Sequence, residues 1–404
     1  MAQIAVIGGG QAGYSVVAKL RGLGFDGTIS LICGEDELPY QRPPLSKKYL
    51  LGEYERERLY LRQASFYEEN DIRLRCGTPC REIDTAARRL HVGDDEIPYD
   101  SLVIATGSEP RVLPASVGGD LRGVHTVRTI ADIDRIASEV EDSGQAVVVG
   151  GGYIGLEAAS ALVTKGLPVT IIEMAERILQ RVAAAETSNH LRQLHLDHGA
   201  AVLEATQLRQ LQADADGHVA AAILADGRCI EADLVIVGVG IQPVTDLAQM
   251  AGIVIDNGIR TDAACRTSDA SVWAAGDCAS FPWRGRRIRL ESVQNAIDQA
   301  EHAAAAILGS EEAYEPTPWF WSDQYSAKLQ IAGLGTGYDR IVRRSGSAAD
   351  SVSYWYFHGS ELLAVDAVND SRSYMIGKRL LESGKSADPA AVADPEINLK
   401  SLLK

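Results

Sequence analysis

The chain has 404 residues, of which 46% are hydrophobic and 23% charged, and its net charge of −16 gives a sequence pI of about 5.0. This composition is that of an ordinary globular protein with two or three domains, and the acidic balance argues against a nucleic-acid partner. No apolar run approaches the roughly 18 residues of a membrane span and no targeting segment is recognisable, so we expect a cytoplasmic protein that does not enter membranes.

The first elements form a unit that can bind a dinucleotide. We expect a strand at Ile4–Ile7, a glycine-rich turn at Gly8–Gly13, a helix at Tyr14–Arg21 and a strand at Thr28–Ile32, followed by the acid Glu35. In such a G-x-G-x-x-G turn the glycines tighten the backbone, admit a pyrophosphate to the helix N-terminus and let the helix pack on the strand. The acid suits a ribose hydroxyl.

A proline-rich segment and, further along the chain, another buried strand follow. Pro43-Pro44 fixes an extended backbone, and Ser46 is expected to cap a short helix that carries Lys47. We then expect a polar helix within Arg56–Asn70 and a buried strand at Leu102–Gly107. Because that strand ends in small residues, its backbone could pass close to a flavin.

A second dinucleotide-binding unit repeats the pattern. The strand Ala146–Val149 leads into the turn Gly150–Gly155, and the strand Val169–Ile172 ends on the acid Glu173. A carboxylate there binds the ribose of NADH and repels the 2′-phosphate of NADPH. Two complete units predict two dinucleotides, most economically one nicotinamide and one flavin. The alternative is two such folds that hold other nucleotides, or one vestigial site.

Two further features fit a flavin. The strand Val272–Ala279 runs into a Gly-Asp turn, where Asp277 can bind a ribityl hydroxyl or the pyrophosphate; its spacing fits equally a turn aspartate that caps its own loop. Ser292 is expected to cap an alanine-rich helix that ends near Leu308. The N-terminus of that helix would favour negative charge on a reduced flavin.

A basic loop stands out in this acidic chain. The stretch Trp283–Arg289 contains four arginines, namely Arg284, Arg286, Arg287 and Arg289. They could dock an acidic protein partner, although charge runs of this kind are often only solvated.

The C-terminal part has a different pattern. Aromatic residues concentrate in Pro318–Gln324, where Trp319 or Trp321 could flank a flavin or an electron exit, or simply pack in a core. A compact α+β unit follows, with period-two strands at Leu329–Ala332, Tyr338–Val342, Ser351–Phe357 and Glu361–Val368 and a helix at Ser373–Leu381. The six cysteines are scattered without a C-x-x-C pair, so we expect reduced thiols and no metal site.

Over its whole length the chain resembles the FAD-dependent NADH:ferredoxin reductases of bacterial oxygenase systems, the putidaredoxin reductase and aromatic-ring dioxygenase ferredoxin reductase family. The strings Pro43–Lys47 and Pro318–Gln324 are the most specific, and both glycine turns agree. The resemblance implies an α/β fold with two Rossmann-like, glutathione-reductase-like domains and a C-terminal α+β domain. It places FAD on residues 1–110 and 241–320, NADH on 111–240, and an interface domain at 321–404.

The resemblance also implies site residues. Those matched to FAD are Gly8, Gly10, Ala12, Gly13, Glu35, Lys47, Cys80 through its backbone, Ala105, Thr106, Gly107, Arg128, Asp277, Ser292 and Val293. Those matched to NADH are Gly150, Gly152, Tyr153, Ile154, Gly155, Glu157, Glu173 and Gly240. Lys47 and Glu157 are expected to form an ion pair beside the flavin N5. The alternatives are that Lys47 is a surface lysine and that Glu157 is only a polar position on a helix face of small residues. Trp319 and Trp321 are the other catalytic candidates.

The implied reaction is hydride transfer from NADH to FAD, followed by two one-electron transfers to a [2Fe–2S] ferredoxin that feeds an oxygenase. We expect a monomer that serves a haem-thiolate monooxygenase in preference to a Rieske dioxygenase. One alternative is an NADH oxidase or peroxidase, and the absence of a cysteine near Ser46 argues against the peroxidase form. Another is a signalling flavoprotein like apoptosis-inducing factor, which the absence of long insertions disfavours.

Overall fold

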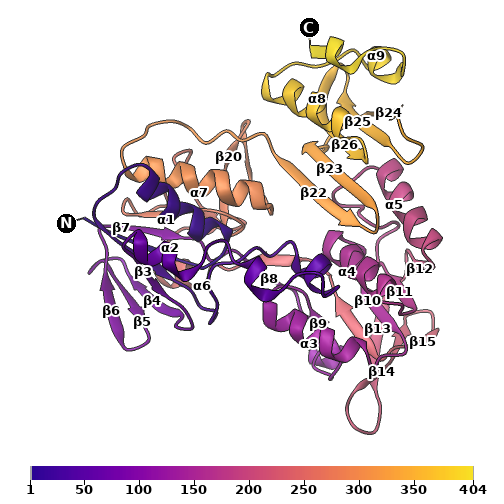
Figure 1. Cartoon of the computed structure of the whole chain (residues 1–404), viewed down its shortest axis with the longest axis horizontal. Helices are drawn as coiled ribbons and strands as arrows, with labels where there is room; N and C mark the ends of the chain where they lie inside the picture. The colour runs from indigo at the N-terminus through magenta and orange to yellow at the C-terminus, as the bar shows by residue number, and fades with distance from the viewer. Residues whose placement is uncertain (1, 404) are drawn as a thin grey trace. The chain divides into compact units, whose positions relative to one another are not determined.

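The computed structural model describes residues 2–403, which form two compact units. Unit 1 contains the chain up to Arg42 together with Glu55–Glu109 and Ile241–Pro316, and unit 2 contains Pro43–Tyr54, Pro110–Gly240 and the chain from Thr317 onward. The chain therefore crosses from one unit to the other several times, as the colours of Figure 1 show.

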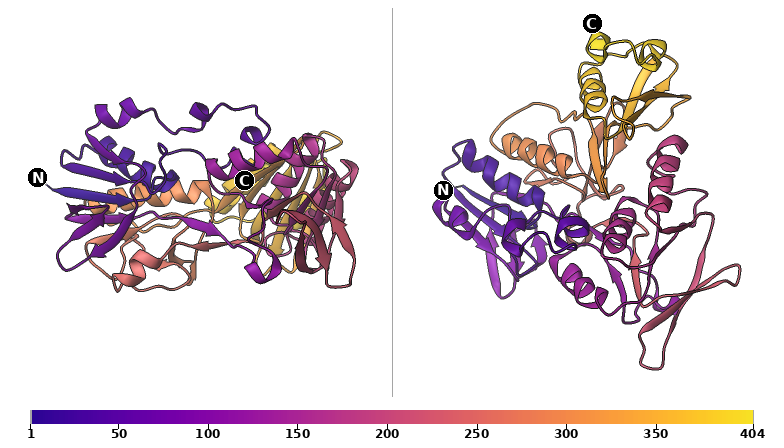
Figure 2. Two further views of the ribbon diagram at one scale, coloured as in Figure 1. Left: turned by 90° about the horizontal axis from the view of Figure 1, so that it is seen from below. Right: turned by 45° about the vertical axis from the view of Figure 1, so that its right-hand side comes forward.

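Unit 1 is built on a five-stranded parallel sheet. Its order is β19 (Val272–Ala274), β7 (Ser101–Ile104), β1 (Gln3–Ile7), β2 (Thr28–Ile32) and β3 (Ile72–Arg75). The helices α1 (Gln11–Gly22) and α7 (Val293–Ile307) pack side by side against this sheet (Figures 1 and 2). Because helices and further strands cover the sheet, its central strands are nearly all apolar and buried.

Two small antiparallel sheets complete unit 1. One is formed by β4 (Cys80–Asp84), β5 (Arg89–Val92) and β6 (Asp95–Pro98), whose buried side chains join those of the large sheet in one apolar core. In the other, β20 (Ala279–Trp283) lies between β18 (Ile259–Arg260) and β21 (Arg286–Ile288). The arginine-rich stretch, expected as a loop, is therefore mostly the β20–β21 hairpin.

Unit 2 repeats the parallel sheet. The strand order is β12 (Ala201–Leu203), β11 (Val169–Ile172), β10 (Ala146–Val149), β16 (Leu234–Val237) and β9 (Val124–Thr126). Its helices are α3 (Ile130–Val140), α4 (Tyr153–Thr164) and α5 (Ala185–Asp197). The strands β13 (Leu208–Ala213), β14 (Val219–Leu224) and β15 (Cys229–Glu231) form an antiparallel extension.

The C-terminal part of unit 2 is an antiparallel sheet with helices. Its order is β22 (Trp319–Gln324), β23 (Ala327–Gly333), β26 (Glu361–Val368), β25 (Val352–His358) and β24 (Arg340–Ser345), with α8 (Ser371–Glu382) against it (Figure 2). The tail contains α9 (Pro389–Ala393) and the turn η4 (Leu399–Leu403). The buried Arg344 guanidinium donates to four tail carbonyls and holds the tail in place.

Two further local expectations were wrong. Ser46 does not cap a helix: it lies inside a short π-helical turn, η1 (Leu45–Tyr49), and its hydroxyl is engaged elsewhere. The polar helix expected over 56–70 is broken into η2 (Arg56–Leu59) and α2 (Ala64–Glu69). The backbone between them is extended because Leu59 and Leu61 bond to the preceding segment near Tyr40.

Candidate active site

The first glycine turn has the shape that a bound pyrophosphate requires. Gly8 has φ +122°, and a Cβ on it would lie 2.1 Å from the Ala105 carbonyl oxygen. A Cβ on Gly13 would lie 1.8 Å from the Gly8 oxygen, so neither position accepts a side chain. Gly10, which precedes α1, has nothing within 4 Å of its Cβ direction. The turn is thus closed on one side by backbone atoms and open at the helix N-terminus, as the binding of a dinucleotide pyrophosphate needs.

Residues from distant parts of the chain gather around this turn in unit 1. A Cβ on Gly276 would lie 3.1 Å from the Cβ of Ala12, and the Ala275 amide donates to the Ile104 carbonyl at 3.1 Å. The Asp277 carboxylate accepts a hydrogen bond from Ser108 at 2.8 Å. The structure therefore brings the strand end at 105–107, with Thr106 and Gly107, and the Gly-Asp turn to the first glycine turn.

Sequence reasoning missed a glutamine that supports the Gly-Asp turn. The fully buried Gln299 on α7 accepts from the Gly276 amide at 2.8 Å. Ser292 caps the same helix, as expected, by accepting from the Asn295 amide, and Val293 is its first residue. The signal that could have indicated Gln299 is a polar residue on the alanine-rich face of a helix that is expected to be buried.

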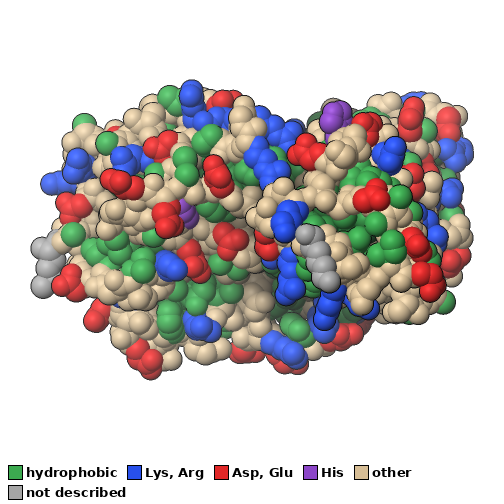
Figure 3. Space-filling view, turned by 90° about the horizontal axis from the view of Figure 1, so that it is seen from above, with side chains coloured by type: hydrophobic (Ala, Val, Ile, Leu, Met, Phe, Trp, Pro, Cys, Tyr) green, Lys and Arg blue, Asp and Glu red, His purple; other side chains and the backbone are tan. Residues whose placement is uncertain are grey.

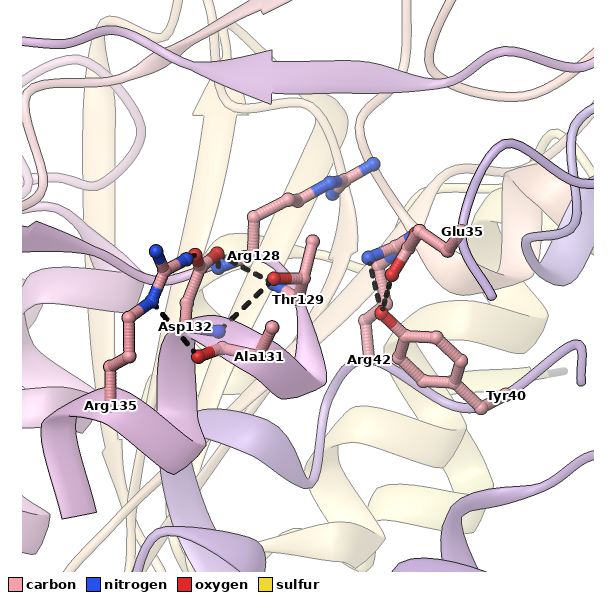
Figure 4. A network of polar contacts seen from close by, with 8 residues as sticks. All are labelled: Glu35, Tyr40, Arg42, Arg128, Thr129, Ala131, Asp132 and Arg135. Carbon is pink, nitrogen blue, oxygen red and sulfur yellow. Dashed lines mark hydrogen bonds and ion pairs between the residues drawn. The ribbon is translucent and has the colours of Figure 1, made fainter. Parts of the chain in front are cut away.

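The acid after the second strand of unit 1 is already paired. Glu35 accepts from the Tyr40 hydroxyl at 2.5 Å and from the Arg42 guanidinium at 2.6 Å (Figure 4). Arg42 also stacks its guanidinium on the Tyr40 ring. The sequence reasoning chose Glu35 alone, and the structure adds Tyr40 and Arg42 as candidates that orient it.

Two other FAD candidates lie in different surroundings. Cys80 is buried under the large sheet of unit 1, and this burial raises the pKa of its thiol to about 11, so the thiol itself is inert. Arg128 belongs to unit 2, where its amide donates to Asp132 beside the capping box that Asp132 makes with Thr129 (Figure 4).

The second glycine turn, in unit 2, is likewise closed by backbone atoms on one side and open at the helix N-terminus. Gly150 has φ +107° with a Cβ direction 2.4 Å from the Gly238 oxygen, and a Cβ on Gly155 would lie 2.2 Å from the Gly150 oxygen. Gly152, before α4, meets only one atom, at 3.9 Å. The same construction leaves room for a second pyrophosphate.

The acid Glu173 and three other candidate residues lie around the second turn. The Glu173 carboxylate accepts from the amides of Gly151 and Ala175, both at 2.7 Å, which holds it against the turn. Tyr153 and Ile154 open α4, and Ile154 is 43% exposed. Gly240 has φ +106° and accepts from the Arg111 amide.

Lys47 and Glu157 form a buried ion pair in unit 2. The ammonium of Lys47 lies 3.1 Å from Glu157 and 3.6 Å from Asp323, and the Glu157 side chain is only 4% exposed. The hydroxyls of Ser46 and Ser322 donate to the two oxygens of Glu157, each at 2.7 Å. Burial raises the pKa of Glu157, while Lys47 and the two hydroxyls act in the opposite direction. Lys47 is therefore not a surface lysine, and Ser46 and Ser322 are partners that sequence reasoning missed.

The two candidate tryptophans differ in their packing. Trp319 and Trp321 have ring centroids 5.6 Å apart on β22. Trp319 packs against the core of the C-terminal sheet and contacts Tyr374, with the Lys378 ammonium over its ring. Core packing thus accounts for Trp319, and Trp321 is left as the candidate beside an electron path.

The four arginines of the β20–β21 hairpin are not equivalent. Arg287 donates to the carbonyls of Thr261 and Ser280, and Arg289 donates to the Asp277 carbonyl and pairs with Glu291. Arg284 and Arg286 are exposed, and both guanidiniums stack on Trp283. Only these two present their charge freely to a partner.

Comparison with known proteins agrees with this geometry. Residues 2–300 match the pyridine nucleotide-disulphide oxidoreductase family and residues 319–403 match the reductase C-terminal family. Rhodocoxin reductase of Rhodococcus erythropolis is 41% identical over 98% of this chain and 93% of its own, and putidaredoxin reductase of Pseudomonas putida is 37% identical over 99% and 96%. The ferredoxin reductase of the CYP199A2 system of Rhodopseudomonas palustris has a TM-score of 0.97 with 36% identity and full coverage of both chains, and the putidaredoxin reductase–putidaredoxin complex has 0.96 with 36% identity, covering all of this chain and 98% of that one.

The fold and both glycine turns define a two-dinucleotide-binding oxidoreductase. The chain belongs to the FAD-dependent ferredoxin reductases of bacterial oxygenase systems, and it is an NAD(P)H-dependent ferredoxin reductase. The expected fold class is confirmed. Membership implies FAD and NAD(P)H as cofactors, and the open sides of the two turns fit them.

Among residues 2–403, no helix is both long and apolar enough to cross a bilayer. The same part of the chain contains no group of three or more histidine, cysteine or acidic side chains that could hold a metal ion.

Proposed function

We propose that this reductase takes its hydride specifically from NADH and delivers the two electrons singly to a [2Fe–2S] ferredoxin. When bound, FAD supplies the conversion from a two-electron donor to one-electron acceptors. The residues of the chain bind and orient the reacting groups and set the charge around them.

The observation that carries the proposal is the buried Lys47–Glu157 pair. Glu157 lies in the second turn of α4, the helix whose N-terminus would receive the NADH pyrophosphate. Its carboxylate holds the Lys47 ammonium at 3.1 Å, and both side chains are largely removed from water. A fixed positive charge of this kind stabilises the negative charge that a hydride brings to a flavin.

The preference for NADH rests on Glu173. Its carboxylate is anchored by two backbone amides, so it would stay in place when a nucleotide binds. An anchored negative charge at the end of β11 binds ribose hydroxyls and repels a 2′-phosphate.

Anaerobic stopped-flow mixing tests the proposal. NADH should bleach the flavin in one rapid phase, whereas NADPH at equal concentration should react at least about tenfold more slowly, a difference of ~1.4 kcal/mol. Glu173→Gln should reduce this discrimination, and Glu176→Gln, an exposed neighbour, should leave it unchanged. Faster reduction by NADPH in the wild type would contradict the proposal.

We further propose that the ferredoxin serves a haem-thiolate monooxygenase. Support comes from the likeness to the reductase of the CYP199A2 system, since CYP denotes such an enzyme. The reductase component of the anthranilate 1,2-dioxygenase system, at 38% identity, keeps a dioxygenase as the competing partner. Ferredoxin-dependent reduction of cytochrome c separates either role from an NADH oxidase or a signalling flavoprotein, and reconstitution with each oxygenase class separates the two systems.

A further inference from the structure

A chain of buried polar side chains leads from Glu157 to α5. Ser322 donates to Glu157 at 2.7 Å and accepts from the Gln324 amide nitrogen at 3.1 Å. The Gln324 amide oxygen lies 3.0 Å from His195 Nε2, and His195 Nδ1 lies 3.2 Å from the Tyr325 hydroxyl. Ser322, Gln324 and His195 are each at most 1% exposed.

The available donors and acceptors fix the direction of every hydrogen bond in this chain. An ionised carboxylate only accepts, so the single O–H of Ser322 points to Glu157. The Ser322 oxygen then accepts from the amide NH₂ of Gln324, which turns the amide oxygen of Gln324 toward His195. Because an amide oxygen only accepts, His195 carries its proton on Nε2 and accepts from Tyr325 at Nδ1.

We infer that His195 and Gln324 are positioning residues that keep Glu157 ionised by holding the Ser322 hydroxyl turned toward it. The link to catalysis rests on the proposed function, in which Glu157 holds the Lys47 ammonium in place. Without the Nε2–H donor, the Gln324 amide can rotate and present its oxygen to Ser322. The Ser322 hydroxyl would then have two competing acceptors, and Glu157 would lose a charge-assisted hydrogen bond.

The charge states of the groups around this series of hydrogen bonds agree with the inferred bond directions. Burial lowers the pKa of His195 to about 4, so its ring is neutral at physiological pH, as a donor at Nε2 and an acceptor at Nδ1 require. The groups that face Glu157 are Lys47 from η1 and Tyr153 from its own helix, and Asp323 acts through Lys47. Lys47 is thus the one positive charge among them, and the hydroxyl of Ser322 adds to its effect.

The tautomer of His195 gives a test that does not depend on turnover. Holoprotein labelled with ¹⁵N-histidine should show a His195 ring that is protonated at Nε2 and does not titrate between about pH 5.5 and 8.5. The signals are assigned by their loss in His195→Gln. Glu157→Gln should weaken the tautomer preference, because an amide at 157 can donate to Ser322 and release the order of the chain. A protonated imidazolium at pH 7, or a proton on Nδ1, would overturn the inference.

The pH profile of flavin reduction gives the second test. Reduction by NADH should fall at low pH as Glu157 becomes protonated, and His195→Leu should move this acid limb upward by about one pH unit, a tenfold gain in proton affinity. His195→Gln should retain the wild-type limb, because its amide NH₂ can replace Nε2–H. Tyr325→Phe, which keeps the ring stacked on His198, should move the limb slightly in the same direction as His195→Leu.

The proposed function and the inference about His195 fail under different outcomes. If Glu157→Gln left flavin reduction unchanged at every pH, the proposed role of the Lys47–Glu157 pair would be wrong. The tautomer measurement would still decide whether the hydrogen bonds from Glu157 to His195 have the inferred directions. If Glu157→Gln slowed reduction while His195→Leu and Tyr325→Phe both kept the wild-type acid limb, the inference about His195 would be wrong and the proposed function would stand.

Discussion

Glu157 illustrates how a carboxylate can stay charged on an otherwise apolar helix. Its neighbours Leu156 and Ala158 are fully buried, and a lone buried carboxylate would take up a proton. Here one ammonium and two hydroxyls supply three donors to its two oxygens. Such a pair contributes little net stability, because desolvation offsets the attraction, so its geometry is better explained by function.

Glu157→Gln tests this residue directly. The substitution keeps the shape but removes the charge that holds Lys47, so anaerobic flavin reduction by NADH should slow by about tenfold or more, while the NADH concentration for half-maximal rate changes little. Asp323→Asn is the matched control. It removes the second, longer and half-exposed partner of Lys47 and should change the rate less than about threefold. Equal effects of the two substitutions would contradict the assignment.

At the scale of single residues, the glycines were the most predictable part of the site. The pattern named Gly8, Gly13, Gly150 and Gly155, and the structure explains each by backbone atoms that a Cβ would strike. The partners of Glu157 were unpredictable because they come from distant segments. Nothing in the local sequence of Ser322 or Gln324 separates a buried hydrogen-bonding residue from an exposed one.

At the scale of elements, the strand β22 and the β20–β21 hairpin escaped prediction for physical reasons. In β22 the positions 322 and 324 are polar yet buried, because Ser322 and Gln324 belong to the network around Glu157, so the usual alternation is inverted. In the β20–β21 hairpin the turn is Arg284-Gly285, with φ +45° and +75°. An arginine at a positive φ is an uncommon turn residue, and the run of charges suggested a solvated loop instead.

The hairpin gives the second prediction. Arg284→Glu combined with Arg286→Glu reverses two exposed charges. At about 0.15 M salt, where the net charge is screened, the KM for an acidic ferredoxin should therefore rise by about tenfold while turnover with ferricyanide stays constant. Arg287 is left intact because its bonds to Thr261 and Ser280 are structural. Arg209→Glu, an exposed arginine on β13, serves as the control and should not change the ferredoxin KM. An unchanged KM in the double variant would exclude the hairpin as a docking site.

The third prediction concerns the junction of the C-terminal sheet with the segment at α5. The carboxylate of Asp366 on β26 accepts from the hydroxyls of Tyr356 and Thr187, and Tyr356 in turn accepts from the Ala184 amide. Burial raises the pKa of Asp366 to about 6, although both hydroxyls lower it. A folded pKa above the unfolded value means that this group stabilises the fold most below about pH 4, and that this stabilisation is lost as the pH rises to about 6.

Asp366→Asn removes this titration. The free energy of unfolding of the wild type, relative to the variant, should therefore fall by on the order of 3 kcal/mol between about pH 4 and 6 and stay constant above. Urea titrations of both proteins across this range give the difference. Asp350→Asn, at an exposed position, is the control and should show no such trend. A difference that rises with pH would contradict the raised pKa.

At the scale of the whole molecule, the fold was predictable because the sequence contains the dinucleotide-binding pattern twice. Each parallel sheet has its own strand, glycine turn, helix and acid, and helices cover strands that are largely apolar. The assignment of segments to compact units was less visible, because residues 43–54 and the chain from Thr317 onward group with the second sheet. Such grouping depends on contacts between segments far apart in sequence, which periodicity does not report.

The net charge of −16 poses a problem for association with an acidic ferredoxin, which the distribution of charge can solve. On the face in Figure 3, lysine and arginine side chains stand among acidic ones, so both signs occur at short range. At about 0.01 M salt the Debye length of roughly 30 Å lets the partner sense the net charge, whereas at about 0.15 M it is roughly 8 Å and only nearby charges act. Repulsion by the net charge should therefore dominate at low salt, and local attraction by Arg284 and Arg286 should dominate at higher salt.

The rate of ferredoxin-dependent cytochrome c reduction, measured at limiting ferredoxin, should therefore rise with added salt, pass through a maximum, and fall again as the local attraction is screened. The variant with Arg284→Glu and Arg286→Glu should keep the rising limb, which belongs to the net charge, and lose the falling limb, which belongs to the hairpin. Ferricyanide, a small anion that needs no docking surface, should show only a rise. A wild-type rate that falls steadily from the lowest salt would mean that the local basic surface outweighs the net charge at all distances, and the account of steering would be wrong.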